Sequence, residues 1–357
     1  MAAEGGSTPQ FRILSIDGGG IRGLIPALLL QELETRLRKQ RPDAVLVDYF
    51  HLFAGTSTGG LIALGLTAPG NSGPHPRMDA QRLVDLYRNR GPEIFHRTLT
   101  QKLRTLGGWT GPKYDLDALR AVLTDELGSA QLANALRELL VVGYDTAAPG
   151  PHFFKRWQAL AAPEENPSMV EVGLATSAAP TYFPAVGLDD AAIVDGGVFA
   201  ANPTIAAVSE ALKRTTEPPA PLVPHDLLVL SLGTGRHVDR YSEREVSGWG
   251  KLGWIWPRAS GPPLLEVMFD GQSRSAHHWA HMLLNHVPGQ EPDEEFGHGP
   301  RYWRFEPDLP RPTGLDDASE ATIDELSAAA RGMIEERAAD LDALTAVLET
   351  DGRPAAA

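Results

Sequence analysis

The sequence predicts an α/β fold in which helices cover both faces of a mostly parallel central sheet. Apolar runs typical of buried strands alternate with stretches whose apolar residues recur at helical spacing. Two of the strand-to-helix transitions pass through glycine-rich turns, at 17–23 and 55–60. The run 227–232 is continuously apolar, as expected for a parallel strand buried on both faces. With 357 residues, the chain is long enough for a sizeable core.

The first unit consists of a strand at 11–16, a glycine loop, and a helix whose leucines recur from Leu24 to Leu37. Pro26 falls in the first turn of that helix, where its missing N–H costs nothing. A strand at 49–54 and a helix at 61–66 repeat the order. The pattern then predicts a loop at 68–77, helices at 78–90 and 115–127, a strand at 139–144 with a hairpin partner at 153–157, a helix at 169–177, a strand end at 193–195, a helix at 203–213 capped by Asn202, the strand 227–232, a helix at 264–284, a strand at 302–305 and helices over 317–350.

Composition excludes several classes of site. The chain has no cysteine, which excludes thiol nucleophiles, disulfides and Cys-based metal sites and leaves Ser, Thr, His and carboxylates for chemistry. The formal net charge of −14 argues against a nucleic acid polymer as partner. Residues 313–352 alone carry a net −9, so the acidity belongs mainly to the predicted C-terminal helices.

The run G-T-S-T-G at 55–59 matches the nucleophile elbow, a tight strand-to-helix turn that presents a serine. A strand before it and a helix after it supply the required context. Ser57 is therefore the candidate nucleophile, and the N–H of Thr58 at the helix start faces a developing oxyanion. The alternative interpretation is a glycine-rich turn without catalytic function.

The run D-G-G-G-I-R-G at 17–23 also connects a strand to a helix. Three consecutive glycines allow the backbone to approach an anionic group, and their N–H groups can form an anion-binding nest. A dinucleotide fingerprint fits Gly18-x-Gly20-x-x-Gly23 formally, but the chain has Arg38-Lys39-Gln40-Arg41 where a ribose-binding acid is expected. A P-loop is excluded because no G-K-[ST] follows.

A serine nucleophile needs a base, and the eleven histidines offer no clear one. His277 and His281 share a helix face with His278 between them. A packed or solvated helix face is the favoured interpretation of H-H-W-A-H, since the glutamate of a metalloprotease is missing. A carboxylate is the other option. Asp195 is the best placed, at the end of a predicted strand, because the carboxyl ends of strands in an open sheet converge on one crevice.

Five motifs in this order resemble the patatin-like phospholipase family, over roughly residues 10–305. They are D-G-G-G-I-R-G at 17–23, G-T-S-T-G at 55–59, A-T-S-A-A-P-T-Y-F-P at 175–184, V-D-G-G at 194–197 and L-S-L-G-T-G at 230–235. The resemblance implies a three-layer sandwich and a lipid acyl hydrolase of phospholipase A type, which cleaves carboxylic esters. The sequence has no calcium loop of the D-x-[DN]-x-[DN]-G type, so we expect neither a metal nor a cofactor. It also implies a Ser–Asp dyad without histidine, formed by Ser57 and Asp195.

The resemblance places an oxyanion hole in the glycine loop. It implies donors at Gly18, Gly19 and Gly20, chiefly the last two, in addition to Thr58. Supporting roles fall to Arg22, Gly23, Gly55, Gly59, Gly196 and Gly197. Two interpretations of Arg22 remain open. Its guanidinium either supports the loop or a lipid phosphate, or it simply pairs with a carboxylate. The chain departs from the family pattern at Ala201, where V-F-A-N-N-P is frequent and V-F-A-A-N-P stands here; we expect an effect on turn geometry.

We expect a disordered lead-in at 1–9, a catalytic domain at 10–305 with a lid or regulatory segment at 236–300, and a helical extension at 306–352. Neither a signal peptide nor a spanning segment is apparent, which predicts a cytoplasmic protein in transient contact with a membrane surface. Trp249, Trp254 and Trp256 are candidates for a lid or interfacial anchor, or for packing over the core edge.

The resemblance also extends to effectors of antiviral defence, which suggests activation by a cyclic nucleotide and assembly into a homo-oligomer. Two alternatives remain. One is a His-dependent esterase of other specificity, and the other is a noncatalytic lipid- or nucleotide-binding module on the same fold.

Overall fold

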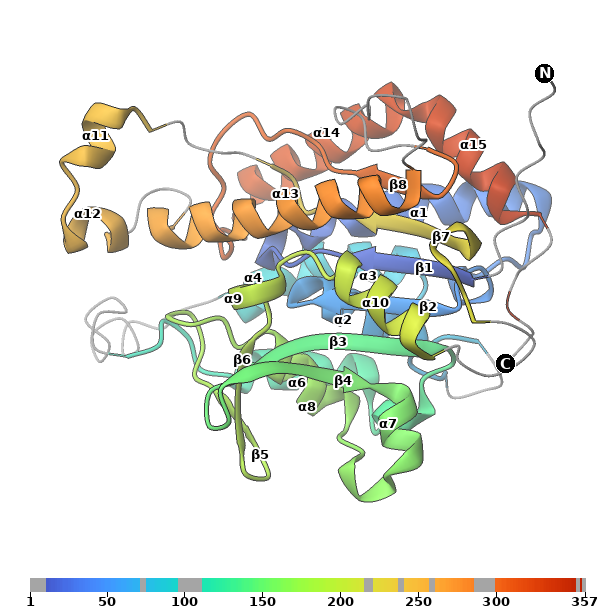
Figure 1. The fold of residues 1–357 in the computed structure, drawn as a ribbon, viewed down its shortest axis with the longest axis horizontal. Helices are drawn as coiled ribbons and strands as arrows, with labels where there is room; N and C mark the ends of the chain where they lie inside the picture. The colour runs from blue at the N-terminus through green and yellow to red at the C-terminus, as the bar shows by residue number, and fades with distance from the viewer. Residues whose placement is uncertain are drawn as a thin grey trace.

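The computed structural model confirms the predicted fold class, a mostly parallel sheet with helices on both faces (Figure 1). It describes residues 11–70, 75–95, 111–214, 221–236, 241–256, 261–285 and 299–350, together with Pro354. The expected lead-in at 1–9 lies outside the described residues.

Eight strands form one sheet in the described part of the chain. They are β1 (Phe11–Ile16), β2 (Leu52–Thr56), β3 (Glu138–Asp145), β4 (Gly150–Lys155), β5 (Val186–Leu188), β6 (Ala191–Asp195), β7 (Leu227–Leu232) and β8 (Tyr302–Phe305). Their order is β5-β6-β3-β2-β1-β7-β8, and β4 also pairs with β3. The ladders among β3, β2, β1, β7 and β8 are parallel, and those that β4, β5 and β6 make are antiparallel.

The sheet is the middle of three layers. In β1 the side chains of Leu14 and Ile16 join one core cluster, and Ile13, the residue before Leu14, joins a second one on the opposite face. The first cluster includes buried residues of α1 (Leu24–Gln40), α2 (Thr58–Thr67), α3 (Ala80–Asp85), α6 (Asp117–Leu127), α8 (Met169–Thr176), α14 (Glu320–Glu336) and α15 (Ala338–Leu348). The second includes those of α10 (Thr204–Arg214) and α13 (Pro263–Asn285).

The short helices surround these layers. They are α4 (Gly91–Ile94), α7 (Arg156–Ala161), α9 (Gly197–Ala200), α11 (Glu243–Ser247) and α12 (Lys251–Ile255). Figure 1 shows α11 and α12 at the end of α13 that lies beyond the sheet. The C-terminal helices pack against α1, and the guanidinium of Arg12 in β1 donates to the carbonyl of Leu348, 2.7 Å away. No helix within the described ranges is long and apolar enough to cross a membrane.

One edge of β3 brings two distant chain segments together. From Glu138 to Val142 this edge pairs with β2, and from Gly143 to Asp145 it pairs with β6. Since β4 occupies the other edge over Leu140–Asp145, β2 and β6 must meet end to end along β3. The residue after β2 is Ser57, and the last residue of β6 is Asp195. The pairing therefore places these two side chains beside each other at one end of the sheet.

Candidate active site

Ser57 occupies a strained turn between β2 and α2. Its backbone has φ 54° and ψ −124°, values that a side-chain-bearing residue adopts only where the surroundings impose them. Gly55 and Gly59 make the turn sterically feasible. A Cβ on Gly55 would lie 2.2 Å from the carbonyl oxygen of Gly59, and one on Gly59 would lie 2.1 Å from that of Ile16. The strand, tight turn and helix that the sequence predicts around Ser57 are thus present.

Thr176, at the end of α8, fixes the elbow. Its hydroxyl oxygen accepts a hydrogen bond from the Ser57 N–H at 2.8 Å and donates one to the Val142 carbonyl at 2.6 Å. The backbone of Ser57 is therefore held to β3 through one buried side chain. Sequence reasoning included Thr176 in a motif but assigned it no role.

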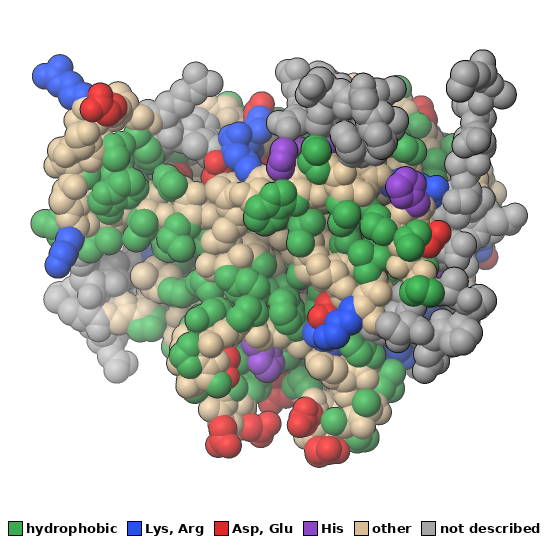
Figure 2. Space-filling view, viewed as in Figure 1, with side chains coloured by type: hydrophobic (Ala, Val, Ile, Leu, Met, Phe, Trp, Pro, Cys, Tyr) green, Lys and Arg blue, Asp and Glu red, His purple; other side chains and the backbone are tan. Residues whose placement is uncertain are grey.

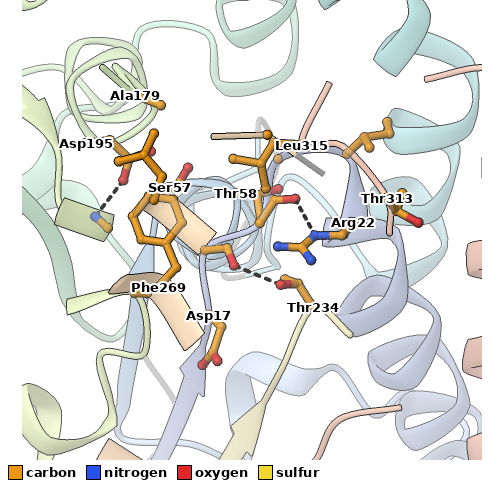
Figure 3. Close-up of a pocket in the computed structure, with 18 of the residues that line it drawn as sticks. Asp17, Arg22, Ser57, Thr58, Ala179, Asp195, Thr234, Phe269, Thr313 and Leu315 are labelled. Atoms are coloured by element: carbon orange, nitrogen blue, oxygen red, sulfur yellow. Dashed lines mark hydrogen bonds between the residues drawn. The ribbon is translucent and has the colours of Figure 1, made fainter. Parts of the chain in front are cut away.

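Asp195 is buried beside Ser57, and one of its carboxylate oxygens accepts the N–H of Gly197 at 2.7 Å (Figure 3). Burial raises the pKa of Asp195 to about 6, and hydrogen bonds from the Ser57 side chain and from Gly197 partly oppose this shift. Gly196 must lack a side chain, because a Cβ there would lie 2.6 Å from the backbone of Val142. A carboxyl group in this state can act as a base near neutral pH.

The glycine loop follows β1 on the other side of Ser57. The N–H of Gly18 donates to the Ala201 carbonyl at 2.9 Å, and its own carbonyl accepts from the Thr234 hydroxyl at 2.8 Å. Gly18 therefore shapes the loop, and its N–H has a partner within the protein. Within the described part of the chain, the N–H groups of Gly19, Gly20 and Thr58 donate to no residue, which leaves them available to an oxyanion.

A buried ionic cluster of Asp17, Arg304 and Glu306 holds the start of this loop in place. Arg304 of β8 donates to both carboxylate oxygens of Asp17, at 2.9 and 2.6 Å, and lies 3.0 Å from a carboxylate oxygen of Glu306. The Ser273 hydroxyl, from α13, also donates to Asp17 at 3.0 Å. Burial raises the pKa of Asp17, and the guanidinium of Arg304 opposes that shift. Arg304 and Ser273 have no local sequence signal, and sequence reasoning missed them.

Arg22 supports the loop through backbone carbonyls. Its guanidinium donates to the carbonyls of Gly19 and Gly235, each at 3.4 Å. Glycine at position 23 is required by close packing, because a Cβ there would lie 2.3 Å from the Thr58 hydroxyl oxygen. Of the two roles considered for Arg22, these contacts favour support of the loop. The departure at Ala201 also concerns turn geometry, since its N–H and C=O bond to the Gln272 side chain and the Gly18 N–H.

Ser57, Asp195 and the glycine loop line one pocket, which Figure 3 shows with Ser57 and Asp195 on one side and Arg22 and Thr234 on the other. Three aromatic rings, those of Phe95, Tyr114 and Phe183, pack together by its wall, with centroids 5.5–6.4 Å apart. The remaining walls are largely apolar and include Ile21, Leu61, Leu86, Ile94, Leu119, Leu265, Val267, Phe269 and Leu315.

None of the histidines in the described ranges lines this pocket. His277 contacts the Tyr302 hydroxyl at 3.0 Å, and His281 is buried beside Asn285, so this pair belongs to the packing of α13 on β8. No cluster of three or more His, Asp and Glu side chains suited to a metal ion occurs among the residues that the structure describes. His96, His237, His286 and His298 lie outside those residues.

The fold and the pocket define a class, that of α/β proteins with a candidate serine-hydrolase site. Residues 14–208 match the family model described as patatin-like phospholipase, and the chain belongs to this family. It is 37% identical over 271 residues to "Patatin-like protein 2" of Arabidopsis thaliana and 36% identical over 263 residues to "Patatin-03" of Solanum tuberosum. These matches cover 70% and 68% of this chain, which spans 66% of each relative. Among solved structures, VipD from Legionella pneumophila aligns with a TM-score of 0.45 at 11% identity, over 94% of this chain and 67% of that one.

Proposed function

We propose that the protein is a lipid acyl hydrolase that cleaves carboxylic ester bonds of membrane phospholipids. The observation that carries this proposal is a strained serine beside a buried carboxylate of raised pKa, in a pocket whose walls are largely apolar. An apolar groove can hold an acyl chain, and the two polar groups meet where its ester would lie. The family described as patatin-like phospholipase supports the same activity.

The reaction proceeds in two halves. Asp195 takes the proton of the Ser57 hydroxyl as its oxygen attacks the ester carbonyl carbon, and the N–H groups of Gly19, Gly20 and Thr58 stabilise the oxyanion. The C–O bond to the alcohol breaks, the alcohol leaves with the proton from Asp195, and an acyl-enzyme remains on Ser57. Water then repeats the attack with Asp195 as base, which releases the fatty acid and restores the serine.

A base other than histidine is supported by the positions of the imidazoles. No histidine of the described ranges lines the pocket, and His277 and His281 are engaged in packing against β8. Asp195, by contrast, is hydrogen-bonded to the Ser57 side chain. We therefore favour the dyad over a His-dependent esterase, and the apolar pocket with a complete dyad over a noncatalytic binding module.

Fatty acid release from phospholipid vesicles tests the activity. Wild-type protein is expected to convert phosphatidylcholine in vesicles to lysophospholipid and free fatty acid, measured by mass spectrometry of the lipids. The Ser57→Ala variant is expected to release neither, because it lacks the attacking oxygen. Equal lipid composition after exposure to the two proteins, with both folded by circular dichroism, would contradict the proposal.

We also propose transient contact with a membrane surface through an apolar rim at the pocket mouth. The rim consists of exposed side chains on α12, on the residue after it and on the start of α13, namely Leu252, Ile255, Trp256, Leu264, Val267 and Met268, whose exposed fractions are 41–65%. Val267 also lines the pocket, so the rim is continuous with the substrate site. Figure 2 shows hydrophobic side chains over α12 and along α13. Trp249, by contrast, packs between Tyr241 and Trp254, with ring centroids 4.8 and 5.1 Å away.

Trp256→Ser is expected to lower the hydrolysis of vesicle phospholipid about tenfold, because burial of a large apolar side chain in lipid contributes about 1.5–3 kcal/mol. Hydrolysis of soluble p-nitrophenyl butyrate should stay within twofold of wild type. Trp279→Ser is the matched control, since Trp279 is 60% exposed on α13 and does not line the pocket. An equal loss on both substrates, or equal losses in the two tryptophan variants, would count against the rim.

The expectations about regulation, assembly, location and domain boundaries remain predictions. Activation by a cyclic nucleotide, a role in antiviral defence, assembly into a homo-oligomer and a cytoplasmic location rest on the resemblance and the sequence alone. The same holds for the boundaries at 236–300 and 306–352.

A further inference from the structure

Ser177 carries a buried hydroxyl that has no part in the reaction proposed for Ser57 and Asp195. Only 8% of the residue is exposed, and its Oγ forms no hydrogen bond with any residue of the described chain. The residue nevertheless lines the pocket of Ser57 and Asp195. Most buried hydroxyls in proteins have a partner, and one without a partner costs free energy. A ligand in the pocket is therefore the natural partner of this group.

The residues on either side of Ser177 anchor the two members of the dyad. Thr176 accepts the N–H of Ser57 at 2.8 Å through its hydroxyl, and the carbonyl of Ala178 accepts the N–H of Asp195 at 3.0 Å. Thr176 also donates to Val142 of β3. Ser177 is thus held by β3 and β6, on the same side of Ser57 as the base.

The order of strands separates two sides of the nucleophile. The glycine loop follows β1, Ser57 follows β2, and Asp195 ends β6, which pairs with β3 beyond the end of β2. The donors of the glycine loop therefore lie on the β1 side of Ser57, whereas Asp195 and Ser177 are anchored to β3, on the other side of β2. The water that cleaves the acyl-enzyme must come to the side of the base, because its proton passes to Asp195.

We propose that Ser177 is a further catalytic residue, whose hydroxyl holds the water of the deacylation step for Asp195. This inference rests on the proposed function. A lipid alcohol is also positioned by its apolar substituents, but a water molecule is positioned by hydrogen bonds alone and needs two or more polar partners. Asp195 supplies one partner, and Ser177 supplies a second in a largely apolar wall. The water oxygen bonds to the acyl carbon, Asp195 takes its proton, and the bond from the acyl carbon to the Ser57 oxygen breaks as that oxygen takes the proton.

Burst kinetics with p-nitrophenyl butyrate separate the two halves of the reaction. For Ser177→Ala we expect a p-nitrophenol burst near one equivalent per site and an acylation rate within threefold of wild type. The steady-state rate should fall about tenfold, the loss of one hydrogen bond to the attacking water. With methanol present, the ratio of methyl butyrate to butyric acid should rise by a similar factor. The melting temperature of Ser177→Ala should be at or above the wild-type value, because the variant loses no hydrogen bond within the protein and no longer buries an unpartnered hydroxyl.

Two further variants serve as controls for Ser177→Ala. Ser177→Thr retains the hydroxyl and should restore most of the steady-state rate. Ser168→Ala removes the capping serine at the other end of α8, where its hydroxyl accepts from Glu171, and should lower the melting temperature without changing the product ratio.

A wild-type steady-state rate in Ser177→Ala, or equal falls in acylation and deacylation, would overturn the role in deacylation. Absence of a burst and of ester hydrolysis in the wild-type protein would instead overturn the proposed function, so the two failures are distinguishable.

Discussion

Asp195→Asn is expected to lower kcat for ester hydrolysis by about 10³–10⁴, because the amide cannot take the proton of Ser57 or of the attacking water. In the wild-type protein the base must be ionised. Since the pKa of Asp195 is raised to about 6, kcat/KM should rise with pH up to about 6 and stay level above it. A steady-state pH profile measures this. Asp190→Asn, at an exposed position in the same β5–β6 hairpin, is the control and should retain wild-type rates.

The same substitution should raise stability above pH 6. The folded chain keeps the Asp195 proton up to about pH 6, whereas the unfolded chain releases it near 3.8, the ordinary pKa of an aspartate side chain. The folded state therefore loses stability between these two pH values, by about 3 kcal/mol at about 1.4 kcal/mol per pH unit. Asparagine carries no charge to bury. Denaturant unfolding should show Asp195→Asn more stable than wild type at pH 8, with the difference gone at pH 4; no difference at pH 8, or a wild-type kcat, would contradict the assignment.

Gly20→Ala is expected to lower kcat by about 10²–10³, the effect of one lost oxyanion donor. Gly20 has φ +58°, and a Cβ there would lie 2.0 Å from the carbonyl oxygen of Leu315, so the loop must move to accept it. Steady-state kinetics on a soluble ester measures the loss, with KM little changed because the donors act on the transition state.

Gly332→Ala is the control for Gly20→Ala, since a Cβ at Gly332 in α14 meets nothing within 4 Å. Circular dichroism shows whether each variant keeps the fold. A folded Gly20→Ala variant within threefold of the wild-type rate would contradict the role of this loop.

The polar side chains of the site could be predicted from sequence where one short segment contains both the turn and the reactive residue. Ser57 follows a strand and precedes a helix, and the glycines at 55 and 59 are required by the backbone contacts found in the turn. Asp195 could be placed because it ends a short apolar run. In both cases a strand end next to a reactive side chain can be recognised within a few residues of sequence.

The supports of the site could not be predicted, because they depend on contacts between distant parts of the chain. Arg304 binds Asp17 across 287 positions, and Leu315 places its carbonyl beside Gly20. The strand 186–188 was not predicted either; it has three residues and is defined by its pairing with β6. The pairing of β6 with the end of β3 is likewise a tertiary feature, and it is what brings Ser57 and Asp195 together.

In the proposed reaction Ser57 is the nucleophile and Asp195 is its base, without a histidine. The most direct test of this assignment is reaction with an alkyl fluorophosphonate, which phosphonylates an activated serine with loss of fluoride, followed by mass spectrometry of the peptides. We expect one adduct, on the peptide that contains Ser57. It should be absent in Ser57→Ala, form at least about a hundredfold more slowly in Asp195→Asn, and form at the wild-type rate when any of the eleven histidines is replaced singly by alanine. An adduct on another residue, or a histidine variant that stops labelling while Asp195→Asn reacts normally, would contradict the assignment.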